Sequence, residues 1–211
     1  MYPGKYAEQN PDRSAFVMAA TGERVSYQEF EARSNRVAHY LADKGLGFQD
    51  HYSIFMENND RYLESCAAGE RSGLYFTCIN SFLTSDELAY IINNSESQIL
   101  ITSMSKLEAA QEALAQCTAI KEVLVVGAGD ADLPEGMSDF ASTLSKYPET
   151  PLERELLGAA MLYSSGTTGR PKGIVRPLPE QSPNEPLPVI GFLSGLWRYR
   201  EDMIYLSPAP L

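Results

Sequence analysis

Short apolar runs alternate with segments of helical spacing through the middle of the chain. The runs YSIFM, LYFTCI, QILIT and EVLVV lie between residues 52 and 126 and have the length and composition of strands. Helical patterns separate them at residues 59–72, 84–93 and 105–117; we expect Asn59 to cap the first, and Thr84 and Glu87 to form a capping box at the start of the second. All residues of EVLVV after the glutamate are apolar, so both faces of this strand would be apolar, as in a strand covered on both faces. This alternation predicts an α/β fold with a mainly parallel sheet and flanking helices.

An N-terminal arm precedes the alternating region. SAFVMAA and ERVS flank a Thr-Gly pair, which predicts a β-hairpin. Ser26 and Glu29 then have the spacing of a helix capping box. Three large apolar residues follow on one helical face: Phe30, Val37 and Leu41. We therefore divide the chain into an arm, residues 1–50, and an α/β subdomain, residues 51–211.

The last third of the chain is less regular. Residues 127–157 are rich in Gly, Asp, Pro and Glu, and predict irregular chain with one short helical turn. GAAMLYS and GIVRP read as strands, and a proline-rich loop follows them. VIGFLSGLWRY predicts a helix weakened by two glycines, and DMIYLS predicts a last strand.

Composition restricts the partners of the protein. Of 211 residues, 44% are hydrophobic and 21% charged, and the formal net charge is -11. Nucleic acid is not expected as a main partner, because surfaces that bind it are basic. No apolar run approaches the length of a membrane span, and the N-terminus lacks a secretory pattern. We expect a cytoplasmic protein whose three cysteines, Cys66, Cys78 and Cys117, are free thiols.

The run SSGTTGRPKG, which begins at Ser164, carries the candidate chemistry. Gly166 and Gly169 allow successive backbone amides to converge on an anion. Four hydroxyls and one cation accompany them: Ser164, Ser165, Thr167, Thr168 and Lys172. These groups suit a polyphosphate. The run is not a Walker A loop, because a strand rather than a helix follows its lysine. Composition alone favours the alternative, a mobile polar hairpin loop without a ligand.

The order of these residues favours the phosphate-binding interpretation instead. S-S-G-T-T-G-x-P-K-G resembles the phosphate loop of the adenylate-forming superfamily, which includes acyl- and aryl-CoA ligases, peptide-synthetase adenylation domains and luciferases. RVSYQEFEARSNRVAHYLADKGL is similar to the superfamily's opening hairpin and helix. Residues 58–102 resemble the segment that builds its first large sheet, and EDMIYLSPAPL resembles a later strand. The resemblance therefore covers nearly the whole chain.

The resemblance implies the N-terminal part of an ATP-dependent acyl-CoA ligase. Such an enzyme converts a carboxylic acid and ATP into an acyl-adenylate and pyrophosphate, and then forms a thioester with CoA. The phosphate loop, residues 163–173, would hold the ATP phosphates through Ser164, Ser165, Gly166, Thr167, Thr168, Gly169 and Lys172. Thr167 would also be a ligand of Mg²⁺. CINSFLTSDELAYI looks more like fatty or aryl acyl-CoA ligases than like amino-acid adenylation domains.

Several motifs of the superfamily find no match before Leu211. We therefore assign no catalytic residue and expect the 211-residue chain to be inactive by itself. The alternative is a stand-alone, non-catalytic α/β module that binds a nucleotide or a partner. By resemblance, the arm packs on a second half of the domain. We expect its apolar face to cause self-association, or to fold back onto the chain's own sheet. We also expect residues 165–170 to be mobile without a triphosphate.

Overall fold

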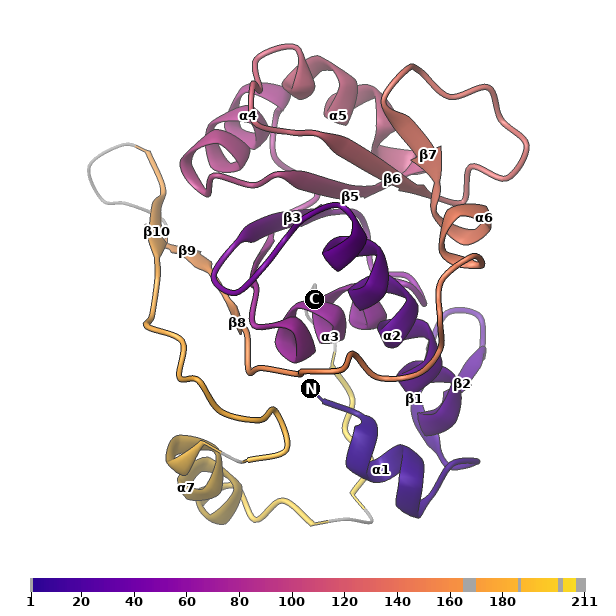
Figure 1. Ribbon diagram of the computed structural model, residues 1–211, viewed down its shortest axis with the longest axis vertical. Helices are drawn as coiled ribbons and strands as arrows, with labels where there is room; N and C mark the ends of the chain where they lie inside the picture. Colours follow the sequence, from indigo (N-terminus) through magenta and orange to yellow (C-terminus); the bar gives the residue numbers. More distant parts are fainter. Residues whose placement is uncertain (1, 165–169, 186, 201–202, 208–211) are drawn as a thin grey trace.

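The fold is seen in a computed structural model, which describes residues 2–164, 170–185, 187–200 and 203–207 (Figure 1). Within these residues the centre is a six-stranded sheet of order β7-β6-β5-β3-β4-β8. Every neighbouring pair in it is parallel. The strands are β3 (His51–Phe55), β4 (Tyr75–Cys78), β5 (Ile99–Ser103), β6 (Glu122–Val126), β7 (Met137–Asp139) and β8 (Ala159–Ala160). The predicted parallel α/β fold is confirmed.

Helices cover both faces of this sheet. One face carries α2 (Tyr27–Asp43), α3 (Tyr62–Ser72) and α6 (Phe140–Leu144), and the other carries α4 (Ser85–Asn94) and α5 (Leu107–Leu114). Successive strand residues point to opposite faces. Ile54 therefore belongs to the first hydrophobic cluster and Phe55 to the second, and both side chains are fully buried. This double burial explains why the strands read as apolar runs.

Helix starts follow the predicted caps in two of three cases. Ser26 and Thr84 each form a complete capping box, with Glu29 and Glu87 respectively. The predicted cap at Asn59 is wrong. Its side-chain oxygen accepts a hydrogen bond from the backbone amide of Arg61 at 2.9 Å, and α3 begins one residue later. Asn59 thus forms a turn before the helix, a use of asparagine that competes with capping. A 3-10 turn, η1 (Met104–Lys106), also precedes α5.

The N-terminal arm folds onto the sheet. It consists of α1 (Gly4–Gln9), an antiparallel hairpin of β1 (Ser14–Val17) and β2 (Arg24–Ser26), and α2. The hairpin was predicted and α1 was not. Val37 and Leu41 of α2 are fully buried in the same cluster as strand residues of the sheet. This packing corresponds to the second of the two outcomes expected for the arm, in which its apolar face folds back onto the chain's own sheet. The division at residue 50 and self-association stay predictions.

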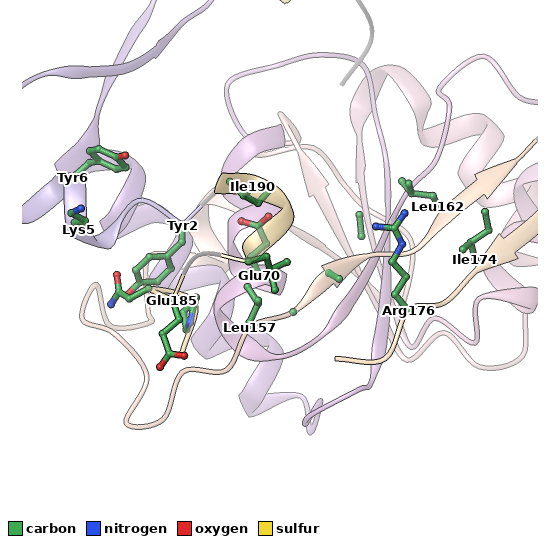
Figure 2. Close-up of a pocket in the computed structure, with 16 residues that line it drawn as sticks. Tyr2, Lys5, Tyr6, Glu70, Leu157, Leu162, Ile174, Arg176, Glu185 and Ile190 are labelled. Atoms are coloured by element: carbon green, nitrogen blue, oxygen red, sulfur yellow. The ribbon is translucent and has the colours of Figure 1, made fainter. Parts of the chain in front are cut away.

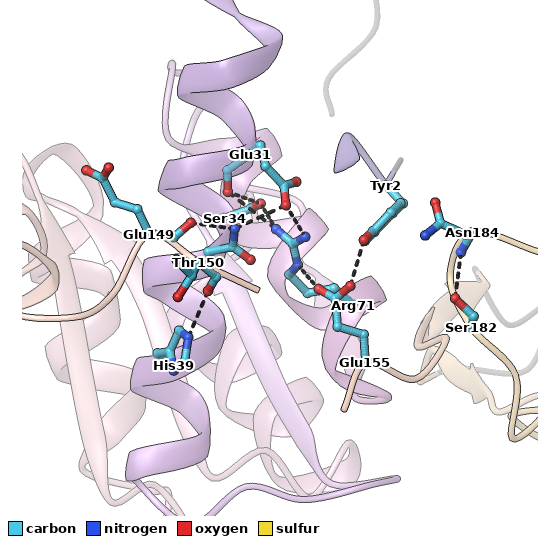
Figure 3. A network of polar contacts seen from close by, with 11 residues as sticks. Tyr2, Glu31, Ser34, His39, Arg71, Glu149, Thr150, Glu155, Ser182 and Asn184 are labelled. Carbon is cyan, nitrogen blue, oxygen red and sulfur yellow. Dashed lines mark hydrogen bonds and ion pairs between the residues drawn. The ribbon is translucent and has the colours of Figure 1, made fainter. Parts of the chain in front are cut away.

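A buried guanidinium ties the arm to the sheet (Figure 3). Arg71 of α3 is fully buried, and it pairs with Glu31 of α2 and with Glu155, which precedes β8, at 2.6 Å each. Its Nη1 also donates to the Ser34 hydroxyl at 2.6 Å. The Tyr2 hydroxyl donates to Glu155 at 2.6 Å. One side chain thereby joins α2, α3, the segment before β8 and the N-terminal residues.

Three predictions for the last third of the chain differ from the structure. Residues 127–157 contain β7, a three-residue edge strand, besides the expected short helix α6. GAAMLYS is not one strand, because the chain leaves the sheet at the buried Met161 and then continues as a separate strand. Residues 203–207 form no strand, and Ile204 is 96% exposed. That segment has no paired neighbour among the described residues, so its strand-like pattern has no sheet to join.

The helix α7 (Pro188–Leu196) was predicted, and none of its described residues is buried. The cysteines are free thiols as expected. Cys66 and Cys78 are nevertheless neighbours, with their sulfur atoms 3.7 Å apart between α3 and β4. No helix in the described part of the chain has the length and apolarity needed to cross a membrane.

Candidate phosphate site

A small hairpin carries the predicted phosphate loop. β9 (Leu162–Ser164) pairs antiparallel with β10 (Lys172–Ile174), and Ser164 lies directly opposite Lys172. The loop thus joins two neighbouring strands, but these form a two-stranded sheet of their own rather than part of the main sheet. Ser164 and Lys172 are both exposed. Ser165, Gly166, Thr167, Thr168 and Gly169 lie outside the described residues, and so does most of the segment expected to be mobile.

Helix α4 holds both strands of this hairpin. The Tyr90 hydroxyl donates to the carbonyl oxygen of Pro171 at 3.0 Å. The guanidinium of Arg170 lies over the Tyr90 ring, 5.0 Å from its centroid. On the other strand, the Tyr163 hydroxyl donates to the side-chain oxygen of Asn94 at 2.8 Å. The two ends of the loop are therefore fixed to one helix.

Sequence reasoning did not find these supporting residues. Tyr90 and Asn94 are four positions apart and therefore share one face of α4. In the sequence, these supporting residues could have been recognised as two polar-tipped residues, four positions apart, on a helix whose other face is apolar and packs on the sheet. Burial, with a smaller contribution from Tyr90, raises the pKa of Tyr163 to about 12. Tyr163 is therefore a neutral hydrogen-bond donor at neutral pH.

A cavity of about 540 Å³ adjoins the hairpin (Figure 2). Leu162 and Ile174 line it from β9 and β10. Alternate residues of a strand share a face, so Ser164 and Lys172 are on the same face of the hairpin as these two lining residues. The volume is within the range of small-molecule pockets. Ser164 and Lys172 do not themselves line the cavity, but they lie on the hairpin face that does.

The remaining walls of the cavity come from four parts of the fold. They are the N-terminal residues with α1, the C-terminal turn of α3, β8 with the residues just before it, and the segment from Arg176 into the first turn of α7. Charged lining residues of both signs are present: Lys5, Glu70, Arg176 and Glu185. The Tyr75 hydroxyl donates to the backbone oxygen of Arg176 at 2.5 Å, which fixes the chain just after β10. The cavity therefore combines apolar walls with a few polar groups.

Metal binding by the protein alone has little support in the described residues. No group of three or more His, Cys, Asp or Glu side chains gathers there. The predicted Mg²⁺ ligand, Thr167, lies outside the residues that the structure describes. Mg²⁺ commonly binds through one or two protein ligands together with substrate phosphates. A hydroxyl in a phosphate loop fits that pattern better than a protein cage would.

Comparison with known proteins assigns the chain to a family. The family model for AMP-binding enzymes matches residues 5–211. The chain belongs to the AMP-binding enzyme family. This AMP-binding family member is 31% identical over 169 residues to a 3-oxocholest-4-en-26-oate–CoA ligase of Rhodococcus rhodochrous, covering 78% of this chain and 30% of that protein. It is 27% identical over 172 residues to acyl-CoA synthetase 7 of Caenorhabditis elegans, a match that covers 81% of this chain and 32% of that protein. The chain thus spans about 30% of the length of these relatives.

Solved structures share the fold of this AMP-binding family member. An anthranilate CoA ligase in complex with anthranoyl-AMP superposes with a TM-score of 0.69 at 20% identity, over 82% of this chain and 33% of that one. A protein described as a long-chain-fatty-acid CoA ligase of Rhodopseudomonas palustris superposes with a TM-score of 0.75 at 22% identity. The superposition covers 94% of this chain and 48% of that one. At these identities the likeness establishes the fold.

Proposed function

We propose that this AMP-binding family member is the phosphate-binding, N-terminal part of an ATP-dependent acyl-CoA ligase. The observation that carries the proposal is the hairpin in which Ser164 faces Lys172 at the two ends of the SGTTGRP run. The names of the relatives support the reaction class, since those quoted above are CoA ligases or an acyl-CoA synthetase. A cytoplasmic location is part of the proposal.

The proposed reaction has two steps. A carboxylate oxygen of the acid attacks the α-phosphorus of ATP, the bond from that phosphorus to the bridging oxygen breaks, and pyrophosphate leaves. The CoA thiol loses its proton to solvent, its thiolate sulfur attacks the acyl carbon, and AMP leaves with the electrons of the acyl–oxygen bond. Both steps transfer a group without oxidation. The first needs negative charge on the departing pyrophosphate to be neutralised.

The hairpin would serve the first step by binding and orientation. Lys172 would place a positive charge on the β- and γ-phosphates, and the hydroxyls and glycine amides of the loop would donate hydrogen bonds. Mg²⁺, held mainly by the phosphates and additionally by Thr167, would supply further charge neutralisation. The anchors from α4 would keep both ends of the loop in place before ATP arrives. Positioning of this kind accounts for much of the catalysis in phosphate chemistry.

The proposed substrate is a carboxylic acid with an apolar body, either fatty or aryl. One of the two relatives quoted above is named for a sterol-derived acid, and the structural neighbours are named for anthranilate and long-chain fatty acids. These acids share a carboxylate and a large apolar part. The cavity beside the hairpin offers apolar walls from Leu162, Ile174 and Ile190. CoA is the proposed second substrate.

Pyrophosphate release tests the proposal. The complete reading frame that contains these residues is incubated with ATP, Mg²⁺, CoA and acids of increasing length, alongside the 211-residue chain. We expect release from the complete protein, its loss in Lys172→Ala, and normal release in the control Lys146→Ala, which changes another exposed lysine. ATP binding without release, for every acid, would favour the non-catalytic module instead. Release that survives Lys172→Ala would refute the role of the loop.

A further inference from the structure

Two of the three cysteines form a close pair on one face of the main sheet. Cys66 is in α3 and Cys78 is the last residue of β4, and their sulfur atoms are 3.7 Å apart. The sulfur–sulfur distance in a disulfide is about 2.05 Å, so the two atoms would have to approach by roughly 1.7 Å. Rotation about the Cα–Cβ bonds of the two side chains can supply such a movement. The pair is therefore not bonded but is within reach of bonding.

The two thiols differ in exposure. Cys66 is buried, with 5% of its surface exposed, whereas Cys78 is partly exposed. The reason lies at the edge of the sheet, because β8 pairs with β4 only as far as Ala160, opposite Phe76. The chain leaves the sheet at Met161, so β8 has no residue paired with Cys78. A small reagent in solution can therefore reach Cys78 more easily than Cys66.

The two thiols also differ in acidity. The Cys66 thiol lowers the pKa of Cys78 by hydrogen bonding, and the nearby Tyr62 hydroxyl adds to this effect, although burial and Glu70 act in the opposite direction. The same thiol contact, together with burial, raises the pKa of Cys66. The Tyr62 hydroxyl is buried without a hydrogen-bond partner among the described residues, and a thiolate on Cys78 would give it an acceptor. Because the thiolate is the reactive form of cysteine, Cys78 is the nucleophile of the pair.

Cys117 provides a comparison within the same chain. It packs in the hydrophobic cluster on the other face of the sheet. Its sulfur lies 3.3 Å from the carbonyl oxygen of Ala113 and 4.0 Å from that of Ala89, so its polar neighbours are backbone oxygens rather than a thiol. Burial raises the pKa of Cys117. Cys117 is therefore expected to react slowly and without a cysteine partner.

We propose that Cys66 and Cys78 form a reversible disulfide when the protein meets a hydroperoxide, with Cys78 oxidised first and Cys66 then attacking it. The disulfide would join α3 to the end of β4. The partly exposed sulfur of Cys78 would be the point at which a reducing thiol opens the bond again. The pair shares no residue with the phosphate loop, so the proposal does not rest on the proposed ligase function.

The oxidation has two balanced steps. The Cys78 thiolate attacks one oxygen of hydrogen peroxide, the O–O bond breaks, and the departing hydroxide takes up a proton and becomes water. Cys78 is then a sulfenic acid. The Cys66 sulfur loses its proton and attacks the Cys78 sulfur, the S–O bond breaks, and hydroxide leaves with that proton as a second water. In total, two thiols lose two electrons to one peroxide, which is reduced to two waters.

Peptide mapping tests the proposal. The reduced, folded 211-residue chain is treated with hydrogen peroxide, unfolded in the presence of N-ethylmaleimide, and digested with trypsin without reductant. Trypsin cuts after Arg71 and Lys106, so the three cysteines fall on three peptides. We expect the peptides of Cys66 and Cys78 to be joined, with a mass about 2 Da below their sum because two hydrogens are lost. Cys117 should carry the maleimide, the chain should stay monomeric in non-reducing electrophoresis, and dithiothreitol should restore all three labels.

Cysteine variants test the order of the two steps. In Cys66→Ala the sulfenic acid of Cys78 has no thiol to attack it, so dimedone should trap it. In Cys78→Ala dimedone should label Cys66 at least tenfold less. Cys117→Ala is the matched control and should form the disulfide as the parent does. Circular dichroism checks that each variant is folded.

Two results would overturn the proposal. One is a parent chain whose peptides stay separate after peroxide treatment, or whose disulfide includes Cys117; this measurement needs no variant. The other is dimedone labelling of Cys66 in Cys78→Ala that equals the labelling of Cys78 in Cys66→Ala, since the two thiols would then not differ as their exposure and acidity require.

Discussion

Replacing Arg71 by methionine should strongly destabilise the protein. Methionine keeps much of the volume of the side chain but removes the guanidinium that pairs with Glu31 and Glu155. The two carboxylates, 15% and 13% exposed, would then keep their charge without a partner. Truncating one member of a buried ion pair typically costs about 3–5 kcal/mol. Because the carboxylates keep some contact with water, we expect a loss near the lower end, about 3 kcal/mol.

This magnitude is easily measured. For a domain of 150–250 residues, each kcal/mol lowers the melting temperature by about 2–4 °C, so a decrease of about 6–12 °C is expected. Urea unfolding followed by circular dichroism gives the same quantity as a free energy. The matched control is Arg154→Met, because Arg154 pairs with Glu180 at 3.4 Å and its side chain is 72% exposed. An exposed pair of this kind contributes about 0–1 kcal/mol.

A double-mutant cycle separates the ion pair from simple packing. Glu155→Gln should cost much less in the Arg71→Met background than in the parent chain, since its charge has already lost its partner. If Arg71→Met unfolds within 1 kcal/mol of Arg154→Met, the two carboxylates must be better hydrated than their burial implies. The reasoning from a buried network would then be refuted.

Three further changes probe the site and the buried carboxyl. Lys172→Ala should abolish the weak ATP affinity expected of the 211-residue chain in calorimetry, and tight binding that persists would contradict the phosphate-loop assignment. Tyr90→Phe removes one hydrogen bond to the loop and should destabilise the hairpin locally by about 1 kcal/mol; hydrogen exchange of β10 amides should become faster, and unchanged rates would argue against this anchor. The folded pKa of Glu64, about 8, is raised above its ordinary 4.5, so the stability gained by its neutral form is complete below pH 4.5 and lost as pH rises through 8. Glu64→Gln should remove that decrease between pH 5 and 8, and a parent protein with no such decrease relative to the variant would refute the burial argument.

The interior of the sheet was predictable because its signals are local. Strands covered on both faces must be apolar, and the two capping boxes place donor and acceptor three residues apart. The edges were less predictable. β7 has three residues in a polar segment and gains its strand geometry from pairing with β6. The break at Met161 depends on where the main sheet ends, and residues 203–207 show that a strand-like pattern needs a neighbour.

The polar interactions were hidden for a different reason. Arg71 pairs with carboxylates 40 and 84 residues away along the chain. The residues next to Arg71 in the sequence therefore do not indicate that its side chain is buried. The same holds for the hairpin anchors. Tyr90 contacts the chain 81 residues later and Tyr163 contacts it 69 residues earlier. The phosphate loop was found because all its groups are consecutive, whereas the residues that position it are brought together by the fold.

The order of strands in the sheet has a consequence for how the protein is made. β3 is the first strand of the main sheet along the chain, and each later strand pairs with one that precedes it: β4 and β5 with β3, β6 with β5, β7 with β6, and β8 with β4. A ribosome delivers roughly 5–20 residues per second from the N-terminus. Every strand of this sheet after β3 therefore leaves the ribosome when the strand that it pairs with has already been made. The hairpin with the phosphate loop follows β8 along the chain, so it is made after all six strands of the main sheet.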